Sequence, residues 1–436
     1  MLTAFTRAFR TPDLRKKLLF TLGIIALFRL GSVLPTPGVH VQNLAACFDQ
    51  ARSGANGQIY GMVQLFSGGA LLKLSVFALG IMPYITASII LQLLVVVIPR
   101  LEALKKEGQS GQAKITQYTR YLTVGLGVLQ STAFIALARS GQLFPNCQQS
   151  VLLNPDNVFQ IVTMVVIMTA GTSVIMWLGE LITDRGVGNG MSILIFTSVI
   201  AVFPSEMANI FQANKVTFAA VLVIGLFLVA AVVFVEQAQR RIPVQYAKRM
   251  VGRRMYGGTS TYIPLKVNQA GIIPLIFASS LLYLPQLVVS LFANTENPHQ
   301  IVQWISQNLA TGDTPIYMAV LFLLIVFFTY FYVSITFNPA EVADNMKKYG
   351  GFIPGIRPGR PTAEYLSFVL NRLTTPGALY LGLISMVPIF ALAVSGASQN
   401  FPFGGASILI MVGVGLDTVK QIESQLQQRN YEGFLR

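Results

Sequence analysis

The sequence predicts an all-α membrane protein, because charged residues are scarce and apolar residues fall into long runs separated by charged loops. Of the 436 residues, 53% are hydrophobic and 11% are charged. Soluble chains carry about 25% charged residues. A bilayer core of roughly 30 Å needs about 20 apolar residues of helix. Ten apolar runs approach that length, and we predict a transmembrane helix at each.

The predicted helices follow one another along most of the chain. They cover 18–34, 72–98, 121–138, 158–178, 187–203, 218–235, 270–291, 315–337, 373–394 and 403–420. The second contains Pro83, so we expect it to be kinked or tilted. The fifth starts at the glycine-rich run 185–190, which we interpret as a flexible helix start, since no strand precedes it as in a dinucleotide-binding fingerprint.

Positive charge predicts the orientation of these helices. An even number of spans places both ends of the chain on one side. Of the 31 Lys and Arg residues, 26 fall on that side, 4 on the other, and Arg29 lies inside the first span. Lys and Arg gather in cytoplasmic loops, so we predict cytoplasmic termini. The net charge of +14 is then mainly a topology signal. The first apolar run is too long for a signal peptide, and we expect it to be retained.

An even number of helices also allows two halves of five, as in many transport proteins. The predicted parts are an arm (1–17), the two halves (18–203 and 204–420) and a tail (421–436). Two cytoplasmic loops, 236–266 and 338–372, are long enough to suggest a function. Their basic residues are either topology signals on solvated loops or a docking surface for an acidic partner or ribosomal RNA.

The sequence contains no recognisable catalytic constellation. A Gly-x-x-x-x-Gly-Lys-Ser/Thr phosphate loop is absent, and the two histidines, His40 and His299, have no metal-ligand cluster around them. We therefore predict neither an enzyme nor a metal or other cofactor. The alternative function is an ion-coupled secondary transporter for small solutes. Such transporters place Asp or Glu at mid-membrane depth, whereas the acidic residues here lie near span ends.

The two cysteines, Cys47 and Cys147, both fall in predicted external loops. That side of a membrane can be oxidising, so a disulfide between them is possible. We expect two free thiols and keep the disulfide as the alternative.

Two features suit a gated pore. The segment at about 59–72 is too short to cross a bilayer, and Gly68 and Gly69 can hinge it against the second span. It would be a movable plug or an interfacial amphipathic helix. Ile81 and Ile85 share one helix face, as Met191 and Ile195 do. A ring of such residues would block ions, although ordinary packing produces the same spacing.

Several sequence motifs run in order over nearly the whole chain. They include Phe66-Ser-Gly-Gly-Ala70, Leu79-Gly-Ile-Met-Pro-Tyr84, Gln117-Tyr-Thr-Arg-Tyr121, Arg185-Gly-Val-Gly-Asn-Gly190, Gln239-Arg-Arg-Ile242, Tyr246-Ala-Lys-Arg249, Phe337-Asn-Pro339 and Pro354-Gly-Ile-Arg-Pro-Gly359. With these motifs the chain resembles the SecY family, the channel subunits of the bacterial Sec preprotein translocon. The resemblance implies ten helices in two halves that open like a clamshell around an hourglass pore.

The resemblance also implies roles for individual residues. The pore ring would comprise Ile81, Ile85, Ile195, Ile276 and Ile410, and the plug would include Tyr60, Met62, Val63, Leu65, Phe66, Gly68 and Gly69. Gln92 and Asn268 would form a polar latch at a lateral gate between the second and seventh helices. Docking of a motor or ribosome would use Arg240, Arg241, Lys248, Arg249, Arg253, Arg254, Lys347, Lys348, Arg357 and Arg360.

The function implied by the resemblance is a protein-conducting channel of the bacterial plasma membrane. It would pass unfolded secretory preproteins across and release transmembrane segments sideways into membrane lipids. Because the chain has no nucleotide site, the energy would come from the SecA ATPase or the ribosome. SecE, SecG and signal-sequence-bearing preproteins would be further partners. Arg357 is the residue most closely tied to motor-driven export, and we predict that Arg357→Glu abolishes it while leaving assembly intact.

Overall fold

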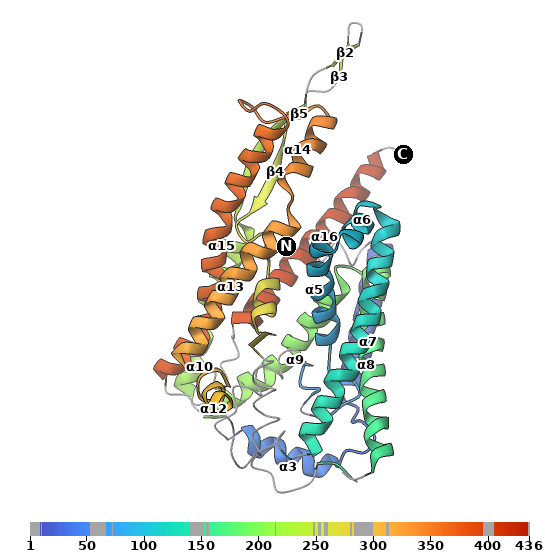
Figure 1. Cartoon of the computed structure of the whole chain (residues 1–436), viewed down its shortest axis with the longest axis vertical. Helices are drawn as coiled ribbons and strands as arrows, with labels where there is room; N and C mark the ends of the chain where they lie inside the picture. The colour runs from blue at the N-terminus through green and yellow to red at the C-terminus, as the bar shows by residue number, and fades with distance from the viewer. Residues whose placement is uncertain are drawn as a thin grey trace.

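The protein is a bundle of long helices with a small β-sheet beyond one end, as Figure 1 shows. The computed structural model describes residues 9, 11–52, 67–71, 73–139, 141, 151–153, 157–213, 215–246, 249–251, 254–256, 260–279, 281–282, 300–310, 314–395 and 405–434. Within these ranges, helical residues lie at each of the predicted spans. The predicted helical membrane fold is therefore confirmed.

The first half of the chain supplies the helices that carry the first five predicted spans. They are α2 (Pro12–Val33), α5 (Met82–Val97), α7 (Gln109–Arg139), α8 (Val158–Arg185) and α9 (Gly190–Ala213). Two shorter helices join them, α3 (Val41–Arg52) at the end away from the sheet and α6 (Pro99–Lys106) after a bend of 100°.

The second half of the chain also supplies long helices, and its loops supply the sheet. Its helices are α10 (Lys215–Gln237), α12 (Gln300–Ile305), the π-helix η1 (Ser306–Ala310), α13 (Pro315–Thr336), α14 (Pro339–Lys348), α15 (Arg360–Ser395) and α16 (Gly405–Phe434). Residues 273–279 and 281–282 are also helical, and we call this segment the gate helix after its predicted role.

Length and hydropathy identify the helices best suited to a bilayer. Within the described residues, five helices are long and apolar enough to cross a membrane, and the bent pair of α5 and α6 makes a sixth candidate. The five candidate spans lie in α7, α8, α9, α10 and the stretch from α13 through α14. The chain is therefore a multi-pass membrane protein, and the full count of ten spans stays a prediction.

The second span differs from the prediction at its start. Residues 73–81 form turns, and the helix begins only at Met82. Leu74 and Gly80 have positive φ angles of 42° and 57°, which interrupt a right-handed helix. Pro83 therefore lies in the first turn of α5, where its missing N–H leaves no helical hydrogen bond unmade. The expected kink within a longer helix is wrong.

The two long loops fold together, which the sequence analysis did not predict. Strands β1 (Gln239–Tyr246) and β4 (Ser260–Lys266) come from the first loop, and β5 (Gly351–Phe352) comes from the second. They form one antiparallel sheet in the order β4-β1-β5. A separate hairpin of β2 (Arg249–Val251) and β3 (Arg254–Tyr256) projects beyond the sheet (Figure 1).

A compact core holds these loops in place. Its buried members are Ile242, Val244, Leu265, Met346, Ile353, Leu366 and Val369. Alternate residues of β1 face this core, because successive strand side chains point to opposite faces. We call the sheet, α14, the first turns of α15 and this core the sheet unit.

The glycine-rich turn before α9 is closely packed, and the predicted flexibility of this helix start stays a prediction. Val187 is 1% exposed, and its N–H donates to the Thr21 hydroxyl of α2 at 3.3 Å. The N–H of Gly190 donates to the Thr183 hydroxyl at 2.9 Å. A Cβ added at Gly190 would overlap the carbonyl oxygen of Gly179, so only glycine allows this close approach of α8 and α9.

The first cysteine corrects another expectation. Cys47 of α3 is fully buried and disulfide-bonded. The sequence has one other cysteine, Cys147, which lies outside the described residues. The expected free thiol is therefore wrong for Cys47, and the disulfide alternative holds.

Candidate functional site

An apolar cluster forms where helices from both halves meet. Its buried members are Ile24, Phe28, Phe77, Ile81, Ile175, Leu178, Ile182, Ile193, Leu194, Ile195, Val199 and Ile410, and Ile85, Met191 and Ile272 pack against it partly buried. We call this set the isoleucine cluster. Helices α2, α8 and α9 of the first half contribute to it, and Ile410 comes from α16 of the second.

The isoleucine cluster brings together four of the five predicted ring residues. Ile81 is 2% exposed at the N-cap of α5, with Ile85 one turn later. Ile195 on α9 is 9% exposed, and Ile410 on α16 is 1% exposed. These residues lie far apart in sequence, so their convergence is a property of the tertiary structure.

The fifth predicted ring residue lies on the gate helix. Ile276 is 4% exposed but is not a member of the isoleucine cluster. Its neighbours Leu275 and Ala278 pack into a second cluster, which belongs mainly to α10, α13, α15 and α16. Ile272, one turn earlier, contacts both clusters, and sequence reasoning did not single it out. Of these two residues Ile272 is the one that packs against the isoleucine cluster, and the pore ring itself stays a prediction.

Chemically, the isoleucine cluster can exclude ions. All of its members have apolar side chains, and the Arg29 guanidinium beside it is engaged by the Gly68 carbonyl. An ion that enters an apolar constriction loses its hydration without gaining a ligand, which is strongly unfavourable. Phe28 and Phe77 stack with ring centroids 6.1 Å apart and brace α2 against the turns before α5. This aromatic support was also missed from the sequence.

The hinge glycines of the predicted plug lie against two helices. Gly68 and Gly69 have positive φ angles of 63° and 82°, a conformation that favours glycine. The Arg29 guanidinium of α2 donates to the Gly68 carbonyl at 3.2 Å, and a Cβ at Gly68 would lie 3.2 Å from the Cα of Ser198 on α9. The other predicted plug residues, Tyr60, Met62, Val63, Leu65 and Phe66, lie outside the described residues.

The two predicted gate residues do not pair with each other. Gln92 is exposed, and its amide donates to the Ser88 hydroxyl at 3.4 Å. Asn268 is 3% exposed, and its Nδ2 donates to Oε1 of Glu236 at 2.7 Å. Between these two described side chains no hydrogen bond forms, so the pairwise latch is absent from this structure. A carboxylate is a stronger acceptor than an amide, and Asn268 is turned toward it.

The predicted docking residues gather on and beside the sheet unit. Arg240 and Arg241 are exposed at the start of β1, and the Arg241 guanidinium lies 4.9 Å from the centroid of the Tyr262 ring. Exposed basic side chains also occur in the last turn of α14, just before α15 and at its first residue; these are Lys347, Lys348, Arg357 and Arg360. Arg360 pairs with Glu364 at 3.1 Å.

Two further predicted docking residues lie on the strands of the projecting hairpin. Arg249 pairs with Tyr256 across β2 and β3, and Arg254 pairs with Val251. Lys248 and Arg253 lie outside the described residues. Figure 1 shows the hairpin as the outermost part of the molecule at this end. The structure thus places the described docking residues at one end of the bundle.

A bidentate ion pair joins α7 to α8. Nε and Nη2 of Arg120 donate to Oε1 and Oε2 of Glu180 at 2.9 and 2.7 Å. Nη1 of Arg120 donates to the side-chain carbonyl of Gln117 at 2.9 Å. The planar guanidinium presents two parallel N–H donors to the two carboxylate oxygens, which gives the ion pair a defined geometry. The motif 117–121 therefore has a structural role that its sequence did not reveal.

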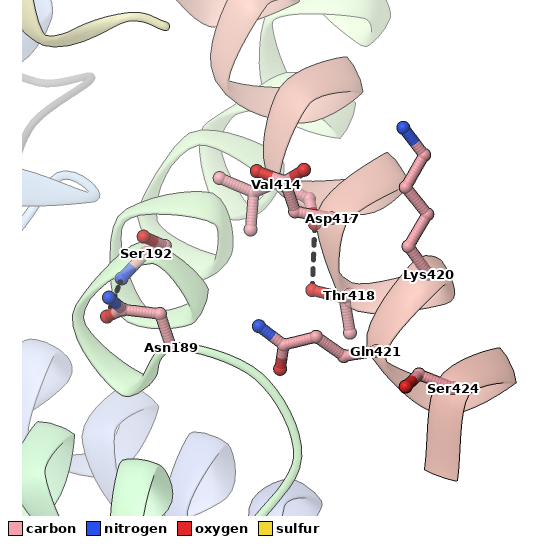
Figure 2. Close-up of a pocket in the computed structure, with 8 residues that line it drawn as sticks. All are labelled: Asn189, Ser192, Val414, Asp417, Thr418, Lys420, Gln421 and Ser424. Carbon is pink, nitrogen blue, oxygen red and sulfur yellow. Dashed lines mark hydrogen bonds between the residues drawn. The ribbon is translucent and has the colours of Figure 1, made fainter. Parts of the chain in front are cut away.

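A polar pocket of about 410 Å³ lies between α9 and α16. Figure 2 shows its lining residues, which are Asn189, Ser192, Val414, Asp417, Thr418, Lys420, Gln421 and Ser424. Lys266 at the end of β4 pairs with Asp417 at 3.4 Å, so the pocket lies on the side of the sheet unit. Among the described residues, no group of three or more His, Cys, Asp and Glu could hold a metal ion.

Comparison with known proteins identifies the relatives of this chain. A SecY family model matches residues 75–419. The protein translocase subunit SecY of Streptomyces scabiei is 68% identical over 442 residues, covering 100% of both chains. The subunit of the same name from Mycobacterium tuberculosis (strain ATCC 25618 / H37Rv) is 58% identical over 442 residues, again covering 100% of both.

Solved structures show the same fold. One, described as the structure of a protein conducting channel, is 18% identical with a TM-score of 0.63, covering 94% of this chain and 91% of that one. Another, described as Sec61 in the canine ribosome-channel complex from the endoplasmic reticulum, has a TM-score of 0.60 at 18% identity with the same coverage. The bundle described above is thus an arrangement that these channels share.

Proposed function

The chain belongs to the SecY family, and from this premise we propose that it conducts unfolded secretory polypeptides through the isoleucine cluster. Protein translocation through a channel is the function that the family and the fold support, and the small-solute transporter is set aside. The observation that carries the proposed path is the meeting of Ile81, Ile195 and Ile410 in one uncharged cluster between the halves.

The apolar lining suits a polypeptide better than an ion. A small ion would lose its hydration shell in the isoleucine cluster, whereas an extended chain brings apolar side chains and carries its backbone through as it moves. Isoleucine side chains offer no hydrogen bonds that would hold a passing peptide in one register. The ring therefore seals a resting channel and yields to a chain that pushes the two halves apart.

Lateral release would use a gate between α5 and the gate helix. When the halves separate along this line, an apolar segment in the pore would face lipid. Transfer into the bilayer is favourable for Leu, Ile, Phe and Val and unfavourable for Asp, Lys and Arg. A transmembrane segment would thus leave sideways, while a polar secretory segment would continue across.

The energy for transport would come from a partner that docks on the sheet unit. Its exposed arginines and lysines suit an acidic protein surface or RNA phosphates. We assign the SecA ATPase and the ribosome to this surface and SecE and SecG to the bundle as companion subunits. A ribosome-channel complex among the related folds supports the ribosomal partner. With the basic loops cytoplasmic, both termini face the cytoplasm of a bacterial plasma membrane.

Site-specific photo-crosslinking tests the path. A photo-reactive residue is placed in turn at Ile85, Ile195, Ile276 and Ile410, and at Phe227 as the lipid-facing control, since Phe227 is 73% exposed on α10. A secretory preprotein is then stalled in membranes supplied with the motor and ATP. Adducts at the ring positions and none at Phe227 are expected, with the weakest signal at Ile276.

Two outcomes would contradict the assignment. No adducts at any ring position, with translocation proven active, would place the polypeptide path elsewhere. Equal adducts at Phe227 would mean that the chain moves along the lipid face.

A further inference from the structure

A partly buried hydrogen bond joins the turn before the gate helix to the end of α10. Glu236 is at the end of α10, and Asn268 lies in the turn between β4 and the gate helix. Nδ2 of Asn268 donates to Glu236 at 2.7 Å and also to the carbonyl of Gly271 at 3.3 Å. A short bond from a buried amide to a carboxylate is stronger than a bond between neutral groups.

The residues around this hydrogen bond are tightly packed, but two of their buried polar atoms have no hydrogen-bond partner among the described residues. The Oδ1 atom of Asn268 and the hydroxyl of Tyr380 on α15 are buried and have no hydrogen-bond partner among the described residues. A Cβ added at Gly377 would lie 2.5 Å from the carbonyl oxygen of Val267, so α15 closes directly over the turn. With Oδ1 unpaired, the described hydrogen bonds of the Asn268 side chain are the two that Nδ2 donates.

Glu236 also belongs to a small charged network. Lys266, Asp417 and Lys420 lie close enough to act on it electrostatically, as Tyr380 does. Lys266 pairs with Asp417 at 3.4 Å. The network thus links α10, β4, α15 and α16, all in the second half, and Glu236 is its contact with the gate turn.

We propose that Glu236 is a positioning residue of the lateral gate: its carboxylate holds Asn268 toward α10 and so keeps the gate helix in its closed position. The proposal rests on the proposed channel function. It replaces a latch across the gate with an anchor inside one half. Opening the gate then requires the turn at 267–271 to leave Glu236, and an apolar signal sequence drives that step by its own transfer into lipid.

The test is a comparison of two substrates in the full complex. Export is measured for a preprotein with its normal signal sequence and for one whose apolar core is shortened by four residues. Glu236→Met removes the acceptor and keeps the side-chain length, and the ratio of weak-signal to normal export should rise about tenfold, the equivalent of about 1.4 kcal/mol for one lost bond. Glu236→Gln keeps an acceptor oxygen and should raise the ratio less.

Matched controls separate an anchor from general damage. Glu423→Met makes the same chemical change on half-buried Glu423 of α16 and should leave the ratio unchanged. A variant that is merely misfolded lowers both exports in proportion, which leaves the ratio at the wild-type value. If Glu236→Met does not assemble, Asn268→Asp sets two carboxylates against each other and should raise the ratio. Adding Glu236→Gln to Asn268→Asp exchanges the donor and the acceptor of the hydrogen bond. The ratio of weak-signal to normal export should then return to the wild-type value.

The outcomes are distinguishable. An unchanged ratio in assembled Glu236→Met would overturn the anchor, and so would failure of Glu236→Gln to rescue Asn268→Asp. If the wild-type chain exports neither preprotein while its assembly is intact, the proposed channel function itself is wrong.

Discussion

The isoleucine cluster and the sheet unit are both built from buried apolar side chains, but different forces hold them. The sheet unit lies outside the bundle, where burial removes apolar surface from water and stabilises by roughly 25 cal/mol per Å². The isoleucine cluster lies inside a bundle whose outer face meets lipid, and lipid is as apolar as isoleucine. Close packing, rather than removal from water, then dominates.

This difference separates their functions. The isoleucine cluster works by lacking polar groups, so that nothing in it binds an ion or holds a peptide. The sheet unit uses its core of residues such as Ile242 and Leu366 to fix a surface of exposed arginines and lysines. The isoleucine cluster excludes ions, and the sheet unit attracts a docking partner. Substitutions can test whether these two properties are independent.

The largest effect should follow a change in the attracting region. Arg357 is exposed at the edge of the sheet unit, so Arg357→Glu should reverse a docking charge without disturbing any buried group. We expect motor-driven export to be abolished while the complex assembles and melts as the wild type does. The measurement is the export of a preprotein into membrane vesicles. The control is Lys215→Glu, at the opposite end of the bundle. Normal export by Arg357→Glu would remove Arg357 from the docking surface.

Next in size is a charge placed in the excluding region. Ile410 is 1% exposed in the isoleucine cluster, and Ile410→Asp would bury a carboxylate with no partner there. We expect a loss of at least about 4 kcal/mol of stability and a leak of ions through the resting channel. Thermal unfolding of the complex and ion flux across proteoliposomes report the two effects. Ile410→Val, the conservative control, should cost about 1 kcal/mol and leave the channel sealed. An Ile410→Asp channel that stays sealed would contradict the role of the ring.

A cavity in the sheet unit should have an intermediate, local effect. Leu366 is 0% exposed in its core, and Leu366→Ala should cost about 2–5 kcal/mol because both burial from water and packing are lost. Hydrogen exchange of β1 and β4 should accelerate, while exchange of α7 and α8 should not change. Leu379→Ala on the same helix, where Leu379 is 46% exposed, serves as the control and should cost less than about 1 kcal/mol. Faster exchange throughout the bundle would show that the two regions are not independent.

The smallest effect concerns the ion pair between α7 and α8. Arg120→Lys keeps the charge but loses the bidentate geometry with Glu180. The two side chains are 42% and 22% exposed, so solvent screens the pair and the loss should be about 0.5–1 kcal/mol. The control is Arg360→Lys, because the pair of Arg360 with Glu364 is highly exposed. Thermal unfolding should show a lower melting temperature than the wild type for Arg120→Lys and no change for Arg360→Lys. Equal shifts for both variants would mean that the bidentate geometry adds nothing.

Local sequence predicted the helices well because bilayer insertion is decided segment by segment. Each apolar run must satisfy its own backbone hydrogen bonds in lipid, and a helix is the solution for a single segment. The motifs 79–84 and 185–190 also predicted the family correctly. The same local information missed the sheet, because Gln245 and Phe352 pair across more than a hundred residues. Strand β1 does pair with β4 of its own loop, but β5 has no partner within its own loop that would identify the register.

In the candidate site, too, the sequence predicted some features and only the tertiary structure decided others. Spacing placed Ile81 and Ile85 on one face, and composition placed the basic residues on one side of the membrane. Only the tertiary structure decided that Ile410 packs into one cluster with them, since that depends on how α16 packs. It also decided that Asn268 bonds to Glu236 and not to Gln92. The sequence by itself determined which segments enter the bilayer, because transfer into lipid is a property of each segment. Contacts between distant segments were left to packing, because each arises from the fit of the whole bundle.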